Sequence, residues 1–107
     1  MIIVTTDQIE GMRITKSLGL VRGSTIRARH LGKDVMAAFR NIVGGEITEY
    51  TKLLAESREQ SIKRMMDEAE SLGANAIVAT RFVTSMVTSG AAELLVYGTA
   101  VMVEEAN

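Results

Sequence analysis

The chain of 107 residues contains no cysteine, no proline and no tryptophan, and it has a single histidine, His30. Without cysteine there is no disulfide, no thiolate metal ligand and no thiol nucleophile, and nothing indicates the redox compartment. The formal net charge of −1 excludes a general electrostatic attraction to nucleic acid or anionic lipid. These absences remove the commonest routes to metal binding and to covalent catalysis.

Long hydrophobic runs are also missing, and none approaches the roughly 18 residues of a membrane-spanning helix. The N-terminal sequence MIIVTTDQIEG has no basic segment and its apolar run ends at Asp7, so we expect no signal peptide and a cytoplasmic protein. Hydrophobic residues make up 47% and charged residues 23%, as is typical of a soluble globular protein. No linker or internal repeat is visible, and residues 1–107 are predicted to form a single domain.

Apolar periodicity and turn residues predict strands, then two helices, then strands. The predicted strands are residues 2–6, 14–31, 74–87 and 91–103, of which 14–31 is a bent strand or a hairpin and the last two form an antiparallel hairpin. The predicted helices are residues 35–43 and residues 48–72, the second capped by Thr48 and closed by Gly73. This order predicts an α+β fold with two layers, in which a mostly antiparallel sheet carries the helices on one face.

Two adjacent glycines, Gly44 and Gly45, separate the two predicted helices in RNIVGGEITEY. Their spacing fits neither a Walker-type loop nor a dinucleotide-binding loop, which need GxxxxGK[ST] and GxGxxG. We interpret the pair as a joint in which Gly44 ends the first helix in the left-handed conformation. A phosphate cradle stays open as the alternative, because backbone N–H groups near Thr48 could hold an anion with Arg40 nearby.

The last predicted strand has apolar side chains on both of its faces. One face carries Leu95, Tyr97, Thr99, Val101 and Val103, and the other carries Leu94, Val96, Gly98, Ala100 and Met102. The preceding strand is similar, with Ala76, Val78, Phe82 and Met86 grouped on one side. Helices on one side of a sheet leave its second face bare, and monomers rarely expose so large an apolar patch. We therefore predict that identical copies bury this face, the alternative being cover by bent strands within one subunit.

The long helix has polar residues, Ser57, Arg58 and Ser61, in the middle of an otherwise apolar stripe. We interpret this turn as facing solvent or a subunit contact. The functional alternative is that Arg58 faces a cavity and binds an anion together with Arg81 from the neighbouring strand. The candidate ligand-binding residues are Arg58, Arg81 and Tyr97, with Arg40 near the helix terminus.

The run RNIVGGEITEYTKLLAESREQSIKRMMDEAESLGANAIV, followed by YGTAV, resembles the YbjQ-like family of small bacterial and archaeal proteins. The resemblance extends over nearly the whole chain, from VTT near the start to GTAV in the last strand. It implies an α+β subunit, similar to dodecin-like subunits, that assembles as a homopentameric ring. The family is labelled as heavy-metal-binding and is otherwise uncharacterised, so the resemblance implies no particular activity.

The residues give the metal label little support. Soft and borderline metals prefer thiolate or imidazole ligands, and this chain offers only His30. A ring could gather several copies of His30, but we predict no metal site and no cofactor. Met65 and Met66 lie on the apolar stripe of the long helix, where filling the core is the better interpretation.

Catalysis and nucleic-acid binding also lack a specific signal. No nucleophile–base pair is marked in the sequence, so an enzyme with its site at a subunit boundary is kept only as the competing class. Six basic residues without acids lie between Glu10 and Asp34, but no aromatic residue interleaves with them to stack on bases. We predict a pentameric ring of unknown biochemical role whose partner is itself, and which binds a small anionic ligand or serves as a scaffold.

Overall fold

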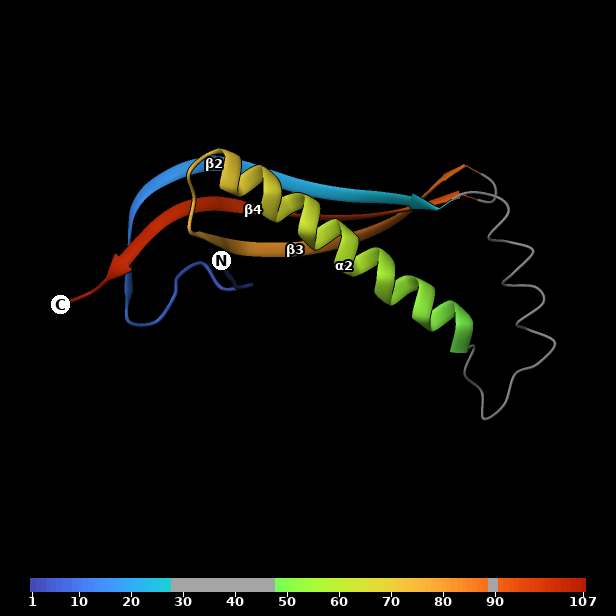
Figure 1. Ribbon diagram of the computed structural model, residues 1–107, viewed down its shortest axis with the longest axis horizontal. Helices are drawn as coiled ribbons and strands as arrows, with labels where there is room; N and C mark the ends of the chain where they lie inside the picture. The colour runs from blue at the N-terminus through green and yellow to red at the C-terminus, as the bar shows by residue number, and fades with distance from the viewer. Residues whose placement is uncertain (28–47, 89–90) are drawn as a thin grey trace.

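The computed structural model describes residues 1–27, 48–88 and 91–107. Its elements are β1 (Ile2–Ile3), β2 (Met12–Arg27), α2 (Thr48–Ser71), β3 (Ala76–Thr88) and β4 (Ala91–Glu105). They form the predicted α+β fold, in which α2 lies on one face of a four-stranded sheet of order β1-β3-β4-β2 (Figure 1). The pair β1–β3 is parallel and the other two pairs are antiparallel, so the sheet is mixed. None of the described helical segments is long and apolar enough to cross a membrane.

Helix α2 begins and ends close to the predicted residues. Its C-terminus is followed by Gly73, whose φ of +84° lies in the left-handed region that favours glycine. The Gly73 N–H donates to the Glu70 carbonyl at 3.0 Å, and the Ala74 N–H donates to the Ala69 carbonyl at 3.1 Å. These two bonds make a Schellman motif and satisfy carbonyls that the helix end leaves free.

Of the two alternatives for the second predicted strand, the structure has the single bent strand. β2 runs antiparallel to β4 over its whole length, with register shifts between Ile14 and Lys16 and between Ser17 and Gly19. Extra residues in one strand bend it and increase its twist, and β2 curves strongly at this end (Figure 1). The predicted helix over residues 35–43 and the glycine pair at residues 44–45 lie outside the described residues.

The main hydrophobic core lies between α2 and the sheet. Its fully buried members come from β2, α2, β3 and β4: Val21, Met65, Ala69, Ile77, Val96 and Ala100. The helix lies over β2 and β4 rather than over β3. On this face of the sheet the helix therefore covers the β2 side and does not cover the outer part of β3.

The middle of α2 approaches β2 at Gly23. A Cβ atom at this position would lie 2.0 Å from the Ser61 carbonyl oxygen and 2.6 Å from the Met65 backbone nitrogen. Ser57 and Ser61 are 2% and 0% exposed, so the prediction that their turn faces solvent or a subunit contact is wrong for both. Their small side chains, together with Gly23, allow the helix backbone to lie directly on the strand.

The buried hydroxyl groups at this crossing bond to one another. Thr25 Oγ1 lies 3.2 Å from Ser61 Oγ, and Ser61 Oγ donates to the Leu94 carbonyl at 3.2 Å. On the rim of the crossing, Arg64 donates from Nη1 to the Ser24 carbonyl at 2.5 Å. Because a buried polar group costs free energy when it lacks a partner, these bonds make the hydroxyl groups of Thr25 and Ser61 tolerable inside the core.

Strand β3 contains an irregularity that simple alternation did not predict. The register passes from Val78 opposite Thr99 to Arg81 opposite Tyr97, and Ala79 has a φ of +53°. The extra residue exchanges the two faces, so that Val78 and Phe82 point to opposite sides of the sheet. The predicted grouping of Ala76 and Val78 with Phe82 and Met86 is therefore wrong.

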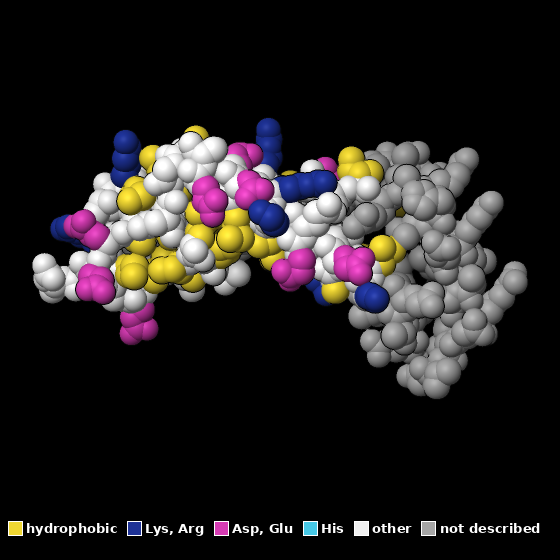
Figure 2. All heavy atoms as spheres, viewed as in Figure 1, with side chains coloured by type: hydrophobic (Ala, Val, Ile, Leu, Met, Phe, Trp, Pro, Cys, Tyr) yellow, Lys and Arg dark blue, Asp and Glu magenta, His cyan; other side chains and the backbone are white. Residues whose placement is uncertain are grey.

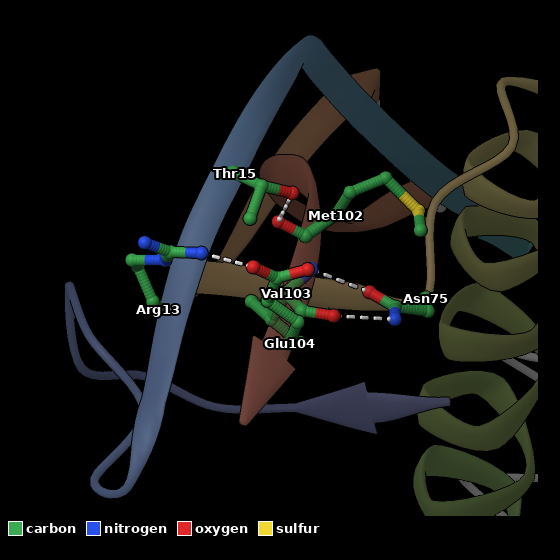
Figure 3. Close-up of polar contacts among 6 residues, drawn as sticks. All are labelled: Arg13, Thr15, Asn75, Met102, Val103 and Glu104. Carbon is green, nitrogen blue, oxygen red and sulfur yellow. Dashed lines mark hydrogen bonds and ion pairs between the residues drawn. The ribbon is translucent and has the colours of Figure 1, made fainter. Parts of the chain in front are cut away.

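A second core cluster covers one end of the sheet face opposite α2. It contains Ala76, Val78, Val101 and Val103, and the N-terminal residues Val4, Ile9 and Met12 pack against it. Asn75 fixes this end, because its Nδ2 donates to the Val103 carbonyl at 2.9 Å and its Oδ1 accepts from the Val103 N–H at 2.8 Å (Figure 3). At this end of the sheet, residues of the same subunit cover the second face, as the alternative to self-association predicted.

The contact at Gly23 predicts the effect of adding one methyl group there. Gly23→Ala places a Cβ against the α2 backbone, which cannot rotate away as a side chain would, so we expect a loss of about 2 kcal/mol in the free energy of unfolding. Urea denaturation followed by circular dichroism measures this loss. Ser24→Ala is the matched control and should unfold near the wild-type midpoint, and equal midpoints for Gly23→Ala and wild type would contradict the close approach.

Candidate functional site

Two of the four predicted ligand residues, Arg81 and Tyr97, are direct neighbours across β3 and β4. Tyr97 also lies opposite Arg22 of β2, so the three residues form one row across the sheet. Val96 and Gly98 are buried on the helix side, and successive residues of a strand point to opposite faces, so the row lies on the face that α2 does not cover. Arg22 was not among the predicted site residues.

We call this surface the open face. It is the part of the sheet opposite α2 that the N-terminal segment does not cover. Its residues are Leu20, Arg22, Ser24 and Ile26 of β2, Arg81, Val83 and Ser85 of β3, and Glu93, Leu95, Tyr97 and Thr99 of β4. Leu20 and Ile26 are 61% and 59% exposed, whereas Tyr97 on the central strand is half-buried. The open face thus carries exposed aliphatic side chains together with polar residues, two arginines and one glutamate.

Arg81 is held in place by the backbone of two segments. Its Nη1 donates to the Thr5 carbonyl at 2.8 Å and to the Thr80 carbonyl at 2.9 Å. These bonds place the guanidinium at the edge of the sheet, where residues 4–6 run beside β3. A hydrogen bond from a charged donor is stronger than a neutral one, so Arg81 is fixed more firmly than a free surface arginine.

Arg58 lies in the other layer of the molecule. It is exposed on α2, next to Ser57, whose side chain is buried on the sheet side of the helix. Within one subunit the sheet therefore separates Arg58 from Tyr97. Arg40, the fourth predicted ligand residue, lies outside the described residues. The strand register places Arg81 and Arg22 on either side of Tyr97, while the hydrogen bonds of Arg81 hold its guanidinium at the outer edge of β3.

The opposite end of the molecule offers a shallow hollow of about 440 Å³. It is lined by Gln8, Ile9, Met12, Arg13, Ile14 and Ala106. Arg13 forms an exposed ion pair with Glu104, and Thr15 donates to the Met102 carbonyl beside it (Figure 3). Because the charge of Arg13 is already paired, this hollow is a poorer candidate for an anion than the row on the open face.

The chain supplies few of the side chains that a metal site needs. The described residues contain no group of three or more histidine, cysteine, aspartate or glutamate side chains that could hold a metal ion. The sequence has no cysteine, and its only histidine, His30, lies outside the described residues. Thiolates and imidazoles are the ligands that heavy and borderline metals prefer, so this donor set does not fit such a metal.

Comparison with known proteins identifies the family. A family model described as "Putative heavy-metal-binding" matches residues 1–104. The chain belongs to this YbjQ-like family. It is similar to the UPF0145 protein of Methanosarcina acetivorans, with 61% identity over 103 residues that cover 96% of this chain and 97% of that protein. The UPF0145 protein of Clostridioides difficile is 56% identical over 107 residues, which cover 100% of this chain and 96% of that protein.

A solved structure shares the fold of the YbjQ-like chain. It is the crystal structure of a protein of unknown function from Pediococcus pentosaceus, belonging to the DUF74 family. The two structures have a TM-score of 0.65 with 15% sequence identity, and the match covers 97% of this chain and 98% of the other. At this identity the likeness concerns the fold alone.

The poor fit between the family description and the donor set predicts the metal content of the protein. Tag-free protein that is mixed with Zn²⁺ or Cd²⁺ and passed through a desalting column should retain far less than one ion per chain, as measured by inductively coupled plasma mass spectrometry. His30→Ala is the control, because any retention that depends on the single imidazole disappears in it. Stoichiometric retention by wild type would show that the donor set has been misjudged.

Proposed function

We propose that this YbjQ-like protein works as a homo-oligomeric ring, the pentamer that the family resemblance implies, and that the ring binds a small anionic ligand or serves as a scaffold for one. The observation that carries the proposal is the open face. Leu20, Ile26 and Val83 are 61%, 59% and 44% exposed there, although they belong to three rows of one continuous sheet. Exposing several aliphatic side chains to water on one flat surface is unfavourable.

Apolar side chains are also exposed on the helix side of β3. Phe82 and Met86 are 46% and 79% exposed, because α2 lies over the other strands. In the view of Figure 2, hydrophobic side chains gather at the surface alongside the helix, in the region of β3. A neighbouring subunit that packs against this side of β3 would bury them as well.

The edges of the sheet offer one way in which copies can join into a ring. Residues 4–6 bond to β3 as far as Thr80, and beyond Thr80 no described strand pairs with the outer edge of β3. β2 forms the opposite edge of the sheet. A free edge attracts another strand, and joining two different edges of identical copies is a heterologous contact, which closes into a ring when the rotation allows it.

The ligand part of the proposal rests on positive side chains. Arg81 and Tyr97 lie side by side on the open face, and Arg58 has no acidic partner among the described residues. In the proposed ring, Arg58 joins the candidate set from a neighbouring subunit, and Arg40 stays a candidate from the sequence alone. Cover by a neighbour would also exclude water and strengthen the attraction between a guanidinium and an anion.

A single charge on the open face tests the assembly. Leu20→Glu places a carboxylate in the contact, where it must be desolvated, so we expect the oligomer to dissociate to a smaller species at micromolar concentration. Sedimentation velocity measures the change. Leu72→Glu makes the same substitution at a residue that is 44% exposed just beyond α2, and it should leave the sedimentation coefficient unchanged. A Leu20→Glu variant that sediments like wild type would remove the open face from the interface.

A further inference from the structure

We infer that the outer edge of β3 is a docking edge for β3 of a second copy, and that the two strands pair antiparallel about a two-fold axis at Thr84. The docking edge is the part of β3 from Arg81 to Thr88, with which no described strand pairs on the outer side. The inference goes beyond the proposed ring and does not rest on it. With this edge occupied by another β3, the open face is left as the contact within a ring.

The backbone of the docking edge has groups that point away from the sheet. The Val4 N–H donates to the Ile77 carbonyl at 3.0 Å, so Ile77 faces the outer edge rather than its partner Ala100. Bonded and unbonded pairs alternate along an antiparallel ladder, so every second residue of β4 from Ala100 to Ala92 leaves its β3 partner unbonded. These partners therefore direct their N–H and C=O groups outwards, and on the docking edge they are Phe82, Thr84 and Met86.

The opposite edge of the sheet, on β2, shows the same alternation and is better protected. Ser24 lies opposite Leu95, and its carbonyl faces away from β4 and accepts from Arg64 Nη1 at 2.5 Å. β2 also carries four basic side chains and two register shifts. Charges and irregularities of this kind protect an edge from the addition of another strand.

The docking edge lacks such protection. The sequence has no charged residue and no proline from Phe82 to Ala92. Phe82 and Met86, two of the outward-facing residues, are 46% and 79% exposed on the helix side of the sheet. A bare edge of this composition is a template for strand addition.

The pattern of the docking edge is complementary to itself. When two copies pair antiparallel about Thr84, the two Thr84 residues lie opposite each other and Phe82 lies opposite Met86 of the second copy. Each aromatic ring then contacts a thioether, which is a favourable pairing, and the exposed side chains of both copies are covered. No two like charges lie opposite each other in this register. A second copy therefore fits the edge better than an arbitrary strand does.

The N-terminal segment sets the length of the docking edge. The Thr80 N–H donates to the Val4 carbonyl at 3.1 Å, so residues 4–6 occupy the edge of β3 as far as Thr80. β3 itself ends at Thr88. Thr80 and Thr88 lie equally far from Thr84 along the strand, so a two-fold axis at Thr84 pairs the whole of the free edge. Another register leaves part of the edge bare or brings the second strand against the N-terminal segment.

Pairing at this edge should be weaker than the contacts within a ring. A single strand-to-strand contact of this length buries less area than a standard interface, so the pairing is expected at concentrations well above the micromolar range. It joins two rings, or two free subunits. The number of subunits in a ring is unchanged by it.

Engineered cysteines test the register, because the wild-type chain has no cysteine that could cross-link. In the inferred pairing Val83 lies opposite Ser85 of the second copy as a non-hydrogen-bonded pair, with Cα atoms about 4.5 Å apart, which a disulfide can bridge. Two copies of Val83, or two of Ser85, lie on a diagonal of about 7–8 Å, beyond that reach. A concentrated mixture of Val83→Cys and Ser85→Cys with oxidised glutathione should give the mixed-disulfide dimer, measured by intact mass, at least about tenfold over the dimer of either variant.

Ser24→Cys is the control for the other edge of the sheet. A disulfide between Val83→Cys and Ser24→Cys would place β2 of another copy beside β3 and overturn the two-fold pairing. Equal amounts of mixed and single-variant dimers would also overturn it, because cross-linking would then not depend on the register. A wild-type ring combined with no mixed disulfide overturns the pairing and leaves the ring standing. Mixed disulfide from chains that sediment as monomers when diluted and reduced supports the pairing and contradicts the ring.

Discussion

A helix can cover only one face of a sheet, and in this protein both faces of the sheet are apolar. Helix α2 is pressed onto β2 at Gly23, where no side chain separates the strand from the helix backbone. The N-terminal segment covers a second area, around Val101 and Val103 on the opposite face. Neither α2 nor the N-terminal segment covers the open face or the outer half of β3. The proposed assembly follows from these two uncovered surfaces.

The candidate ligand residues Arg22, Tyr97 and Arg81 lie on strands rather than on loops. The strands hold Arg22, Tyr97 and Arg81 in register by backbone hydrogen bonds, so the spacing of the row is as rigid as the sheet itself. If the open face forms the contact between copies, the row lies at the seam between them. Assembly and anion binding would then be coupled, because each removes water from the same surface.

Features that depend on residues close together in the sequence were predicted well. Features that depend on which strand or helix lies opposite could not be predicted from the sequence. Thr48 and Gly73 mark both ends of α2 because caps act within one turn, and the β3–β4 hairpin follows from two apolar runs around a turn. The extra residue at Ala79 and the burial of Ser57 depend on what lies opposite them, which alternation along a single strand or helix cannot show. For the same reason Arg22 was missed, since only the register brings it beside Tyr97.

The chain belongs to the YbjQ-like family, whose description names heavy metals, and among the described residues no group of histidine, cysteine, aspartate or glutamate side chains could hold one. The central claim is that other copies of the chain cover the part of the sheet that α2 does not cover. Native mass spectrometry of the tag-free wild-type protein tests it most directly. For the 11.6 kDa chain we predict one dominant species of about five subunits, stable on dilution to micromolar concentration. A dominant species at the mass of a single chain under the same conditions would contradict the claim.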